Sequence, residues 1–440
     1  MSKDRRTERL DDLLVVQGQQ DWQARLATIR NAIRQATWFE DGSPEDTQLC
    51  QIIQAVRKDG DRALLEYTSR YDGVTMGADQ IRVPRQALQD AHGLVESQIL
   101  SAIRSAIANV RRYQSEIFIP SRIRHPGIRF TALQRVGICV PGASAPLAST
   151  VIMTAVPAQV AGVRQIAVVC PPRHHGDIHP MIMAVCWELG IEEVYRIGGA
   201  QAVAALAFGT ETIRPVDKIV GPGNSWVQMA KRRVFGQVDI DSIAGPSEVV
   251  IIANDQANST WVAADMLSQA EHAPGVAVLL TDSMSLARAV LEQLRSQLGG
   301  LSRADTTIDY LIKYGAIVVL EDLDQAVDVA NDFAPEHLEI HCGDQTRDIA
   351  SRITNAGAIF IGPYSPVAIG DYWAGPSHTL PTGQTARFFS PLSSNDFIKS
   401  LSLIEYDKSM LQQAADDIIR LALLEGLDAH AHSVQIRFKG

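Results

Sequence analysis

Between residues 136 and 234 the sequence repeats one local pattern: a short apolar run, a turn rich in glycine or proline, and a longer apolar stretch at helical spacing. The expected strands are residues 136–140, 165–170, 194–197 and 218–220. The turns after them include a small-residue loop at 141–146, Gly198-Gly199 and Gly221-Pro222-Gly223-Asn224. Strands that alternate with helices are typical of a parallel, doubly wound sheet. Glycine-rich turns at the carboxyl ends of such strands place backbone N–H groups at a ligand crevice.

The same pattern restarts after Ser247-Glu248. Apolar strands are expected at residues 249–253, 276–280, 316–320 and 358–361, with helices at 260–272, 283–298 and 323–330. We therefore expect an α/β fold with two Rossmann-like doubly wound α/β domains and small helical N- and C-terminal segments. The GxGxxG fingerprint of a dinucleotide site is absent, because Gly221-Pro222-Gly223 supplies only two of its three glycines.

The segments outside these two regions are expected to be helical. Apolar residues at helical spacing between Leu10 and Ile33 predict a helical arm that packs on another surface, such as a partner subunit. Further helical patterns run from Pro44 past Leu64, from Pro84 to Ile117 as one helix, and from Leu411 to Leu424. The expected division is an N-terminal helical arm (1–38), a first α/β domain in two pieces (39–135 and 249–391), a second α/β domain (136–248) and a C-terminal helical segment (392–440).

Composition narrows the class of protein. A net charge of −10 and an isoelectric point of about 5.6 disfavour nucleic acid and anionic membranes as partners. The charged N-terminus lacks the apolar core of a signal peptide, and no apolar run reaches the ~20 residues of a membrane helix. The five cysteines are scattered and form no CxxC pair, so no disulfide framework is expected. These features predict a globular protein of a reducing, cytoplasmic compartment.

The segment from Phe333 to Ile340 places a carboxylate beside an imidazole, at Glu336 and His337. Pro335 disfavours helix at Ala334 and so favours a turn just before the pair. An acid and a base of different strengths on adjacent residues suit general acid–base catalysis. The alternative is structural: the pair could begin a helix, with Glu336 near the positive end of its dipole.

Three further sets of polar residues could bind a metal or take part in catalysis. Gln269 and His272 are three apart in an expected helix, which would place an amide and an imidazole on one face. Asp371 lies in a segment dense in glycine, proline and aromatic residues, and Glu425 and His430 lie near the C-terminus. Each set has an ordinary alternative, as a helix C-terminus, a rigid surface loop or an exposed tail. No HExxH motif of the zinc proteases occurs.

Taken together, these segments resemble the histidinol dehydrogenase family. The matching stretches keep the same order over about residues 40–435 and are Gly198-Gly-Ala-Gln201, Val216 to Asn224, Ala244-Gly-Pro-Ser247-Glu-Val, Ser268 to His272, Ala334 to Glu339, Gly370-Asp371-Tyr and Glu425 to His430. The resemblance implies a homodimeric enzyme that oxidises L-histidinol through L-histidinaldehyde to L-histidine in two NAD-dependent steps, at the end of histidine biosynthesis.

The resemblance also assigns roles to residues of this sequence. The implied catalytic residues are His337, which accepts protons, and Glu336, which activates water. The implied ligands of one Zn²⁺ per subunit are Gln269, His272, Asp371 and His430. The implied substrate contacts are Ser247, Gln269, His272, His337, Asp371, Glu425 and His430, with Glu425 and His430 coming from the other subunit. The implied NAD contacts are Cys139, Gln201 and Asn224.

The sequence departs from the family pattern at a few positions. Cys139 stands where the family usually has a tyrosine, Ser377 where asparagine is common, and Gln384 where a second glycine is usual. The sequence is also compatible with three other functions. They are a related zinc- and NAD-dependent dehydrogenase of another polar alcohol, a zinc-dependent hydrolase that uses Glu336 as its base, and a metal-binding dimer without catalysis.

Overall fold

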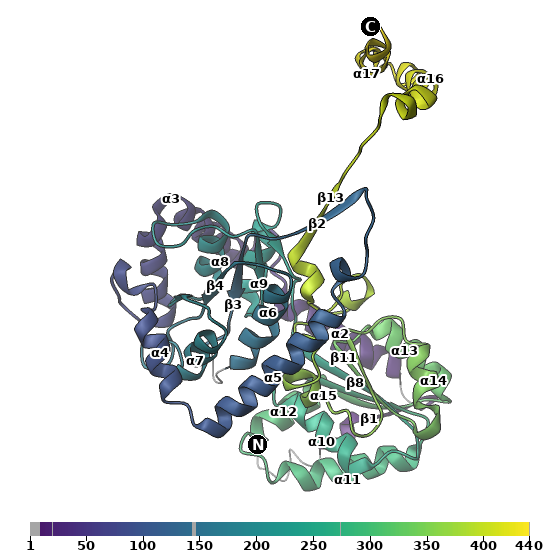
Figure 1. Cartoon of the computed structure of the whole chain (residues 1–440). Helices are drawn as coiled ribbons and strands as arrows, with labels where there is room; N and C mark the ends of the chain where they lie inside the picture. The colour runs from purple at the N-terminus through teal and green to yellow at the C-terminus, as the bar shows by residue number, and fades with distance from the viewer. Residues whose placement is uncertain (1–8, 20, 143–146, 273, 440) are drawn as a thin grey trace. The chain divides into compact units, whose positions relative to one another are not determined.

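The computed structural model of the chain describes residues 9–19, 21–142, 147–272 and 274–439 (Figure 1). Residues 1–8 of the expected N-terminal arm and residues 143–146 of the expected loop lie outside this range. The chain divides into two compact units: Met1–Phe118 with Ala132–Phe397, and Ile119–Thr131 with Ile398–Gly440. In the part that the structure describes, no helix is both long and apolar enough to cross a bilayer.

The first unit contains a five-stranded parallel sheet with the strand order β5-β4-β3-β6-β7. Its strands are β3 (Arg135–Cys139), β4 (Gln165–Val169), β5 (Glu193–Tyr195), β6 (Lys218–Val220) and β7 (Asp239–Ile240). The helices between them are α6 (Ala148–Val160), α7 (Pro180–Glu188), α8 (Gly199–Phe208) and α9 (Ser225–Val234). The chain starts at the central strand β3, runs outward to β5, and then crosses to the other side, which confirms the expected doubly wound order.

The first unit also contains a six-stranded parallel sheet with the order β1-β10-β9-β8-β11-β12. Its strands are β1 (Leu14–Val16), β8 (Ser247–Ala253), β9 (Gly275–Thr281), β10 (Gly315–Val319), β11 (His337–His341) and β12 (Ala358–Ile361). The helices are α10 (Ser259–Ala270), α11 (Met284–Leu298), α12 (Ala304–Tyr314), α13 (Leu323–Phe333), α14 (Thr346–Ser351) and α15 (Val367–Tyr372). Alternate residues of β8 enter two separate apolar cores, so both faces of the sheet are covered.

The N-terminal segment differs from the expected arm. It contains a 3₁₀ turn (Arg9–Leu13), strand β1 and helix α2 (Trp22–Thr37), and β1 pairs in parallel with β10. Leu10 and Leu13 are fully buried in the core on one face of the six-stranded sheet, and Ile29 is fully buried on the other. The apolar residues between Leu10 and Ile33, whose spacing suggested an external partner, are therefore covered by the chain's own sheet.

The helices of residues 44–116 also depart from expectation. α3 (Pro44–Asp72) packs on α8, and α4 (Arg85–Gly93) packs on α7, so both lie on the domain of residues 136–248 rather than on the domain to which the sequence assigned them. The single helix expected from Pro84 to Ile117 is wrong. It is broken into α4 and α5 (Ser97–Glu116), because Gly93 ends α4 and Glu96 is extended before α5.

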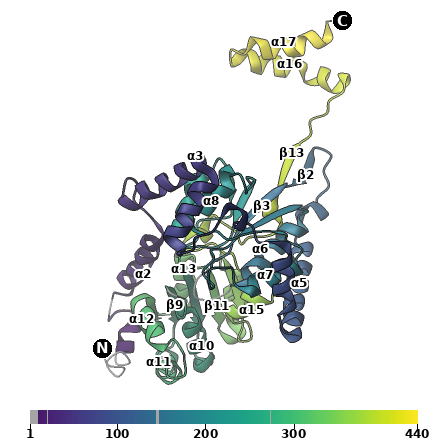
Figure 2. The same cartoon turned by 90° about the vertical axis from the view of Figure 1, so that its left-hand side faces the viewer.

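The second unit contains a two-stranded sheet of β2 (Ile128–Ala132) and β13 (Ile398–Ser402), followed by α16 (Lys408–Leu424) and α17 (Asp428–Gln435). α16 and α17 lie side by side (Figure 2), joined by a turn in which Gly426 has a φ of 73°. The expected helix ending at Leu424 is confirmed; it begins three residues earlier than expected, because the Asp407 side chain accepts from the Met410 N–H at its start.

The burial of Leu13 gives a test of this N-terminal arrangement. Leu13→Ala removes a side chain with no solvent exposure and should cost about 2 to 5 kcal/mol of stability, which lowers the thermal unfolding midpoint by several degrees. The matched control is Leu94→Ala, because Leu94 is 80% exposed in the chain. Equal midpoints for the two variants would contradict the assignment of Leu13 to the chain's own core.

Candidate active site

Glu336 and His337 lie where α13 passes into β11. α13 ends at Phe333, and Ala334 takes a left-handed conformation with a φ of 49° and a ψ of 59°. Pro335 disfavours a right-handed helical conformation at Ala334, so the chain leaves the helix at the position that the sequence predicts. His337 pairs with Val249 in the sheet. The alternative in which Glu336 begins a helix is therefore wrong.

Two hydrogen bonds from the start of β8 hold the Glu336 carboxylate. The Ser247 hydroxyl donates to Oε2 over 2.6 Å, and the Glu248 backbone N–H donates to the same oxygen over 2.9 Å. β8 and β11 are neighbours in the sheet, so their parallel register brings residues about 90 apart in sequence to the same edge. The structure thus brings together Ser247, Glu336 and His337, all three predicted from the sequence.

The hydrogen-bond partner of the His337 ring determines which of its two nitrogens carries the hydrogen. Nδ1 of His337 lies 2.9 Å from the backbone carbonyl oxygen of Glu248, and that oxygen can only accept a hydrogen bond. Nδ1 therefore carries the hydrogen, and in the neutral ring Nε2 keeps its lone pair. The Glu336 carboxylate, 3.5 Å from Nδ1, favours the same tautomer. His337 is 4% exposed, and in this orientation the neutral imidazole can accept a proton at Nε2.

Glu248 is a buried carboxyl that was not among the residues predicted for the site. Its side chain is fully buried, accepts from the Gly383 backbone N–H over 2.6 Å, and leaves its second oxygen without a partner. Burial raises the pKa of Glu248 to about 8, and the charge of Glu336 adds to the rise, while the Gly383 hydrogen bond opposes it. A carboxyl at the start of an otherwise apolar strand is the signal that could have identified it.

His337, at the amino end of β11, opens into a pocket that runs along β12. The pocket is also lined by Asp371, at the end of α15, and by Phe360, Ser377 and His378. Burial lowers the pKa of His378, and His337 lowers it further, while the charge of Asp371 acts in the opposite direction. His378 therefore faces both predicted residues as an uncharged imidazole. His378 was not among the predicted site residues; its place as the single histidine in the segment after Asp371 is the signal that could have identified it.

Gln269 and His272 occupy different environments at the end of α10. Gln269 lies in the last turn, is 2% exposed, and has no hydrogen-bond partner for either amide atom. His272 is exposed and lies beyond the helix, which ends at Ala270, so the predicted pairing of the two on one helical face is wrong. A buried amide without partners is costly, and it fits a ligand from outside the chain, such as a metal ion.

A second pocket lies at the carboxyl ends of the five-stranded sheet, where the glycine turns predict a crevice. Cys139 ends β3, Val169 ends β4, Gly198 follows β5 and Asn224 follows β6; all four line the pocket. Gln201, in the first turn of α8, lines it too. The three predicted NAD contacts, Cys139, Gln201 and Asn224, are therefore brought together. Most of the remaining lining residues are small or apolar, which suits a flat nucleotide ring system.

A buried ion pair shapes the Gly221 turn of this pocket. The Gly221 N–H donates to Asp241 over 2.7 Å, and the Lys231 ammonium donates to the Gly221 carbonyl oxygen over 3.1 Å while pairing with Asp241. Gly221 has a φ of 107°, and a Cβ there would lie 2.3 Å from the Cys139 carbonyl oxygen. Only glycine permits this close approach of β3 and the turn.

Cys139 itself is a poor nucleophile. Burial raises the pKa of its thiol to about 12, and the charge of Lys231 only partly opposes this. The side chain therefore stays a neutral thiol and lines the pocket as a small, largely apolar group. All five cysteines, which lie in the described ranges, are free.

The other two predicted residues, Glu425 and His430, belong to the second unit. Glu425 follows the last residue of α16, and His430 lies in α17. Both side chains are exposed in the chain.

Comparisons with known proteins point to one family. A model of the histidinol dehydrogenase family matches residues 40–438. A histidinol dehydrogenase of Rhodopirellula baltica is 48% identical over 395 residues, covering 88% of this chain and 85% of the relative. One of Geobacillus kaustophilus is 45% identical, covering 94% of this chain and 99% of the relative. The crystal structure of histidinol dehydrogenase from Elizabethkingia anophelis matches with a TM-score of 0.87 at 32% identity, over 97% of this chain and 98% of that one.

The buried carboxyl of Glu248 predicts a pH-dependent stability. Its folded pKa of about 8 exceeds the ordinary value of 4.5, so its contribution to stability is complete below pH 4.5 and is lost as the pH rises through about 8. Glu248→Gln lacks this loss. Relative to wild type, the variant should gain on the order of 4 kcal/mol between pH 4.5 and pH 9, measured as a growing difference in unfolding midpoint.

The control for this experiment is Glu292→Gln, an exposed position on α11. Its difference from wild type should not change with pH. A Glu248→Gln difference that is equally constant would show that Glu248 is ionised in the folded protein.

Proposed function

The chain belongs to the histidinol dehydrogenase family of NAD-dependent oxidoreductases, and on that premise we propose that Glu336 and His337 carry out the acid–base steps as L-histidinol is oxidised through L-histidinaldehyde to L-histidine. The main support is the 2.9 Å hydrogen bond between His337 Nδ1 and the Glu248 carbonyl oxygen. This bond leaves Nε2 as the proton acceptor in a pocket that Asp371 and His378 also line.

His337 is the proton acceptor in both oxidations. Each oxidation removes a hydride from carbon and a proton from a hydroxyl group, and Nε2 would take that proton. Since Nδ1 is already committed to the Glu248 carbonyl, the charged imidazolium that results would keep its hydrogen bond and its orientation. The Glu336 carboxylate, 3.5 Å away, would stabilise that positive charge.

Glu336 is the base for the water that adds to the aldehyde between the two oxidations. The hydrogen bonds from Ser247 and from the Glu248 N–H both go to Oε2, which leaves Oε1 to accept the proton of water. Ser247 would also contact the substrate. As water adds, the His337 imidazolium would return its proton to the carbonyl oxygen, so the neutral ring is available again for the second oxidation, and Glu336 would release its proton to solvent.

NAD would occupy the pocket of Cys139, Gln201 and Asn224, where it would accept the hydride. The small side chain of Cys139 leaves more room beside the Gly221 turn than the tyrosine usual at this position. A hydrolase that used the same Glu336 and metal residues would have no need of this pocket, so the dehydrogenase is the better supported function.

We propose Gln269, His272, Asp371 and His430 as the ligands of one Zn²⁺ per subunit. The unpartnered, buried amide of Gln269 is the observation that favours a metal here. Bound zinc would act as a Lewis acid that holds the polar groups of the substrate without redox chemistry. Because His430 and Glu425 belong to the separate second unit, we propose that a second copy of the chain supplies them, in a cytoplasmic homodimer with shared sites.

Enzyme assays test the roles of the pair. Wild type should reduce NAD with L-histidinol. His337→Asn should lower kcat by about 10² to 10⁴-fold for both histidinol and the aldehyde, because the proton acceptor is lost in each oxidation. Glu336→Gln should slow histidine formation more than it slows the first oxidation. Equal loss of both steps in Glu336→Gln would argue against a role confined to water.

Hybrid dimers test the shared site. A His337→Asn chain and a His430→Ala chain, each inactive alone, should recover about a quarter of wild-type activity per site after mixing and reassembly, because one of the two sites in a mixed dimer has both residues. A mixture of His337→Asn with Glu336→Gln, whose changes lie in the same unit of one chain, is the control and should form no more histidine than the two variants form alone. Equal activity of the two mixtures would contradict the exchange.

A further inference from the structure

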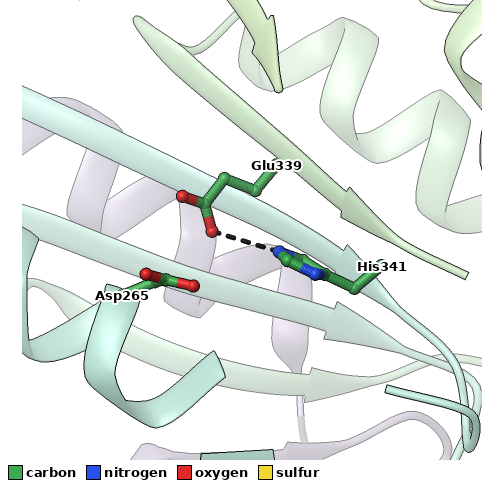
Figure 3. Close-up of side chains that lie close together, drawn as sticks. All are labelled: Asp265, Glu339 and His341. Atoms are coloured by element: carbon green, nitrogen blue, oxygen red, sulfur yellow. Dashed lines mark hydrogen bonds and ion pairs between the residues drawn. The ribbon is translucent and has the colours of Figure 1, made fainter. Parts of the chain in front are cut away.

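A second cluster of ionisable side chains lies behind the site, on the same strand as His337. It consists of Asp265 from α10 and of Glu339 and His341 from β11 (Figure 3). Glu339 has no solvent exposure and His341 has 5%. Nε2 of His341 lies 3.3 Å from Oε2 of Glu339, and the ligand atoms of all three residues lie within 4.8 Å of one another. Neither the acid–base steps nor the proposed zinc ligands use these residues.

One proton shared between Asp265 and Glu339 explains how these ionisable groups can lie so close together without a bound ion. Burial raises the pKa of Asp265, and the charge of Glu339 and a hydrogen bond to Glu339 raise it further. Asp265 is therefore a carboxylic acid that donates to the Glu339 carboxylate. The His341 Nε2–H faces the same carboxylate, so Glu339 is the acceptor at the centre of the cluster.

Glu339 also binds a third element. Its Oε1 accepts the backbone N–H of Val367, the first residue of α15, over 2.9 Å. One fully buried carboxylate therefore joins α10, through Asp265, to β11 and to the start of α15. Such a charge-assisted network in a low-dielectric interior holds its members more rigidly than apolar packing does.

Each of the three elements that Glu339 joins also carries a residue of the proposed site, a few positions along the chain from the residue that makes the contact. Gln269 is four residues after Asp265, one turn along α10. Asp371 is four residues after Val367, one turn along α15. His337 precedes Glu339 by two residues on β11, so the two side chains lie on the same face of the sheet.

We propose that Asp265, Glu339 and His341 are positioning residues that hold α10, β11 and α15 in register, so that Gln269, His337 and Asp371 converge on one metal and one substrate. This inference rests on the proposed function, because it takes Gln269 and Asp371 as metal ligands. Residues that orient metal ligands typically contribute about 10 to 100-fold to metal affinity or activity.

The test compares a variant that keeps the hydrogen bond with one that breaks it. In the full-length, zinc-loaded enzyme, Asp265→Asn replaces the neutral acid by a neutral amide that still donates to Glu339. It should keep zinc affinity, measured by competition with a chromogenic chelator, within about threefold of wild type. Asp265→Leu leaves Glu339 without its donor and should lose at least about tenfold in zinc affinity. At saturating zinc its kcat should fall about tenfold, while the KM for NAD stays unchanged.

Two further variants separate positioning from general destabilisation. Met266→Ala opens a cavity beside Asp265 on the same helix, since Met266 is fully buried. It should lower the unfolding midpoint and leave zinc affinity unchanged. Glu339→Gln removes the central charge while keeping the shape of the side chain, and it should weaken zinc binding as Asp265→Leu does. It replaces Asp265→Leu in the test if the leucine variant does not fold. Zinc loss in Met266→Ala equal to that in Asp265→Leu would overturn the proposal.

Failure of the inference can be told from failure of the ligand assignment. Gln269→Ala is measured in parallel. If it retains wild-type zinc affinity, the proposed ligand set is wrong; if it loses zinc while Asp265→Leu and Glu339→Gln do not, only the positioning role is wrong. A second equivalent of zinc in wild type that disappears in Asp265→Asn would also overturn the proposal, because the cluster would then be a metal site.

Discussion

The parallel pairing of β8 with β11 is the constraint on which the candidate active site depends. In this register His337 is opposite Val249, so Glu336, just before β11, and Ser247-Glu248, the first two residues of β8, lie at one edge of the sheet. The backbone of Glu248 then donates to Glu336 through its N–H and accepts from His337 through its carbonyl oxygen. One residue of backbone thereby orients both the proposed base for water, Glu336, and the proposed base for the alcohol proton, His337. A register shift of one residue would break both bonds and turn the His337 side chain to the other face.

The candidate sites of the two sheets in the first unit lie at different ends of their strands. The pocket of Cys139, Gln201 and Asn224 lies at the carboxyl ends of its strands, the usual position in doubly wound sheets. The pocket of His337 and Asp371 runs along β12 and includes His337 at the amino end of β11, while Gln269, in the last turn of α10, lies beside Gly275 at the amino end of β9. Helices that cross a parallel sheet run antiparallel to its strands, so their C-terminal residues arrive at the amino edge. The amino edge can thus hold a carboxylate, an imidazole and the C-termini of helices. The glycine turns, which suit a nucleotide, stay at the carboxyl edge.

Two acids of this domain, the fully buried Glu248 and the half-buried Asp265, have carboxyl groups whose protonation decides what each can do. Glu248 and Asp265 both have raised pKa values, chiefly because burial disfavours a charged carboxylate. Because each of these two carboxyl groups is neutral, it can lie near a second carboxylate without the repulsion of two adjacent negative charges. The second carboxylate is Glu336 for Glu248 and Glu339 for Asp265. Each of these second carboxylates lies beside a histidine of β11: Glu336 beside His337, as the proposed base, and Glu339 beside His341, in the proposed positioning cluster.

Much of this arrangement follows from the sequence. The alternation of apolar runs, glycine turns and helical spacing determined two doubly wound domains, because that local pattern has few other ways to bury its apolar residues. The Pro335 turn and the adjacent Glu336 and His337 were also visible, since their chemistry is local. The sequence did not reveal that Leu10 and Leu13 pack in the chain's own core, that α3 and α4 belong with residues 136–248, or that His272 lies beyond its helix. These outcomes, and the joining of Asp265 to Glu339, depend on contacts between residues far apart in the chain. Only the tertiary structure decided them, because spacing along one element records which residues share a face but not which element covers it.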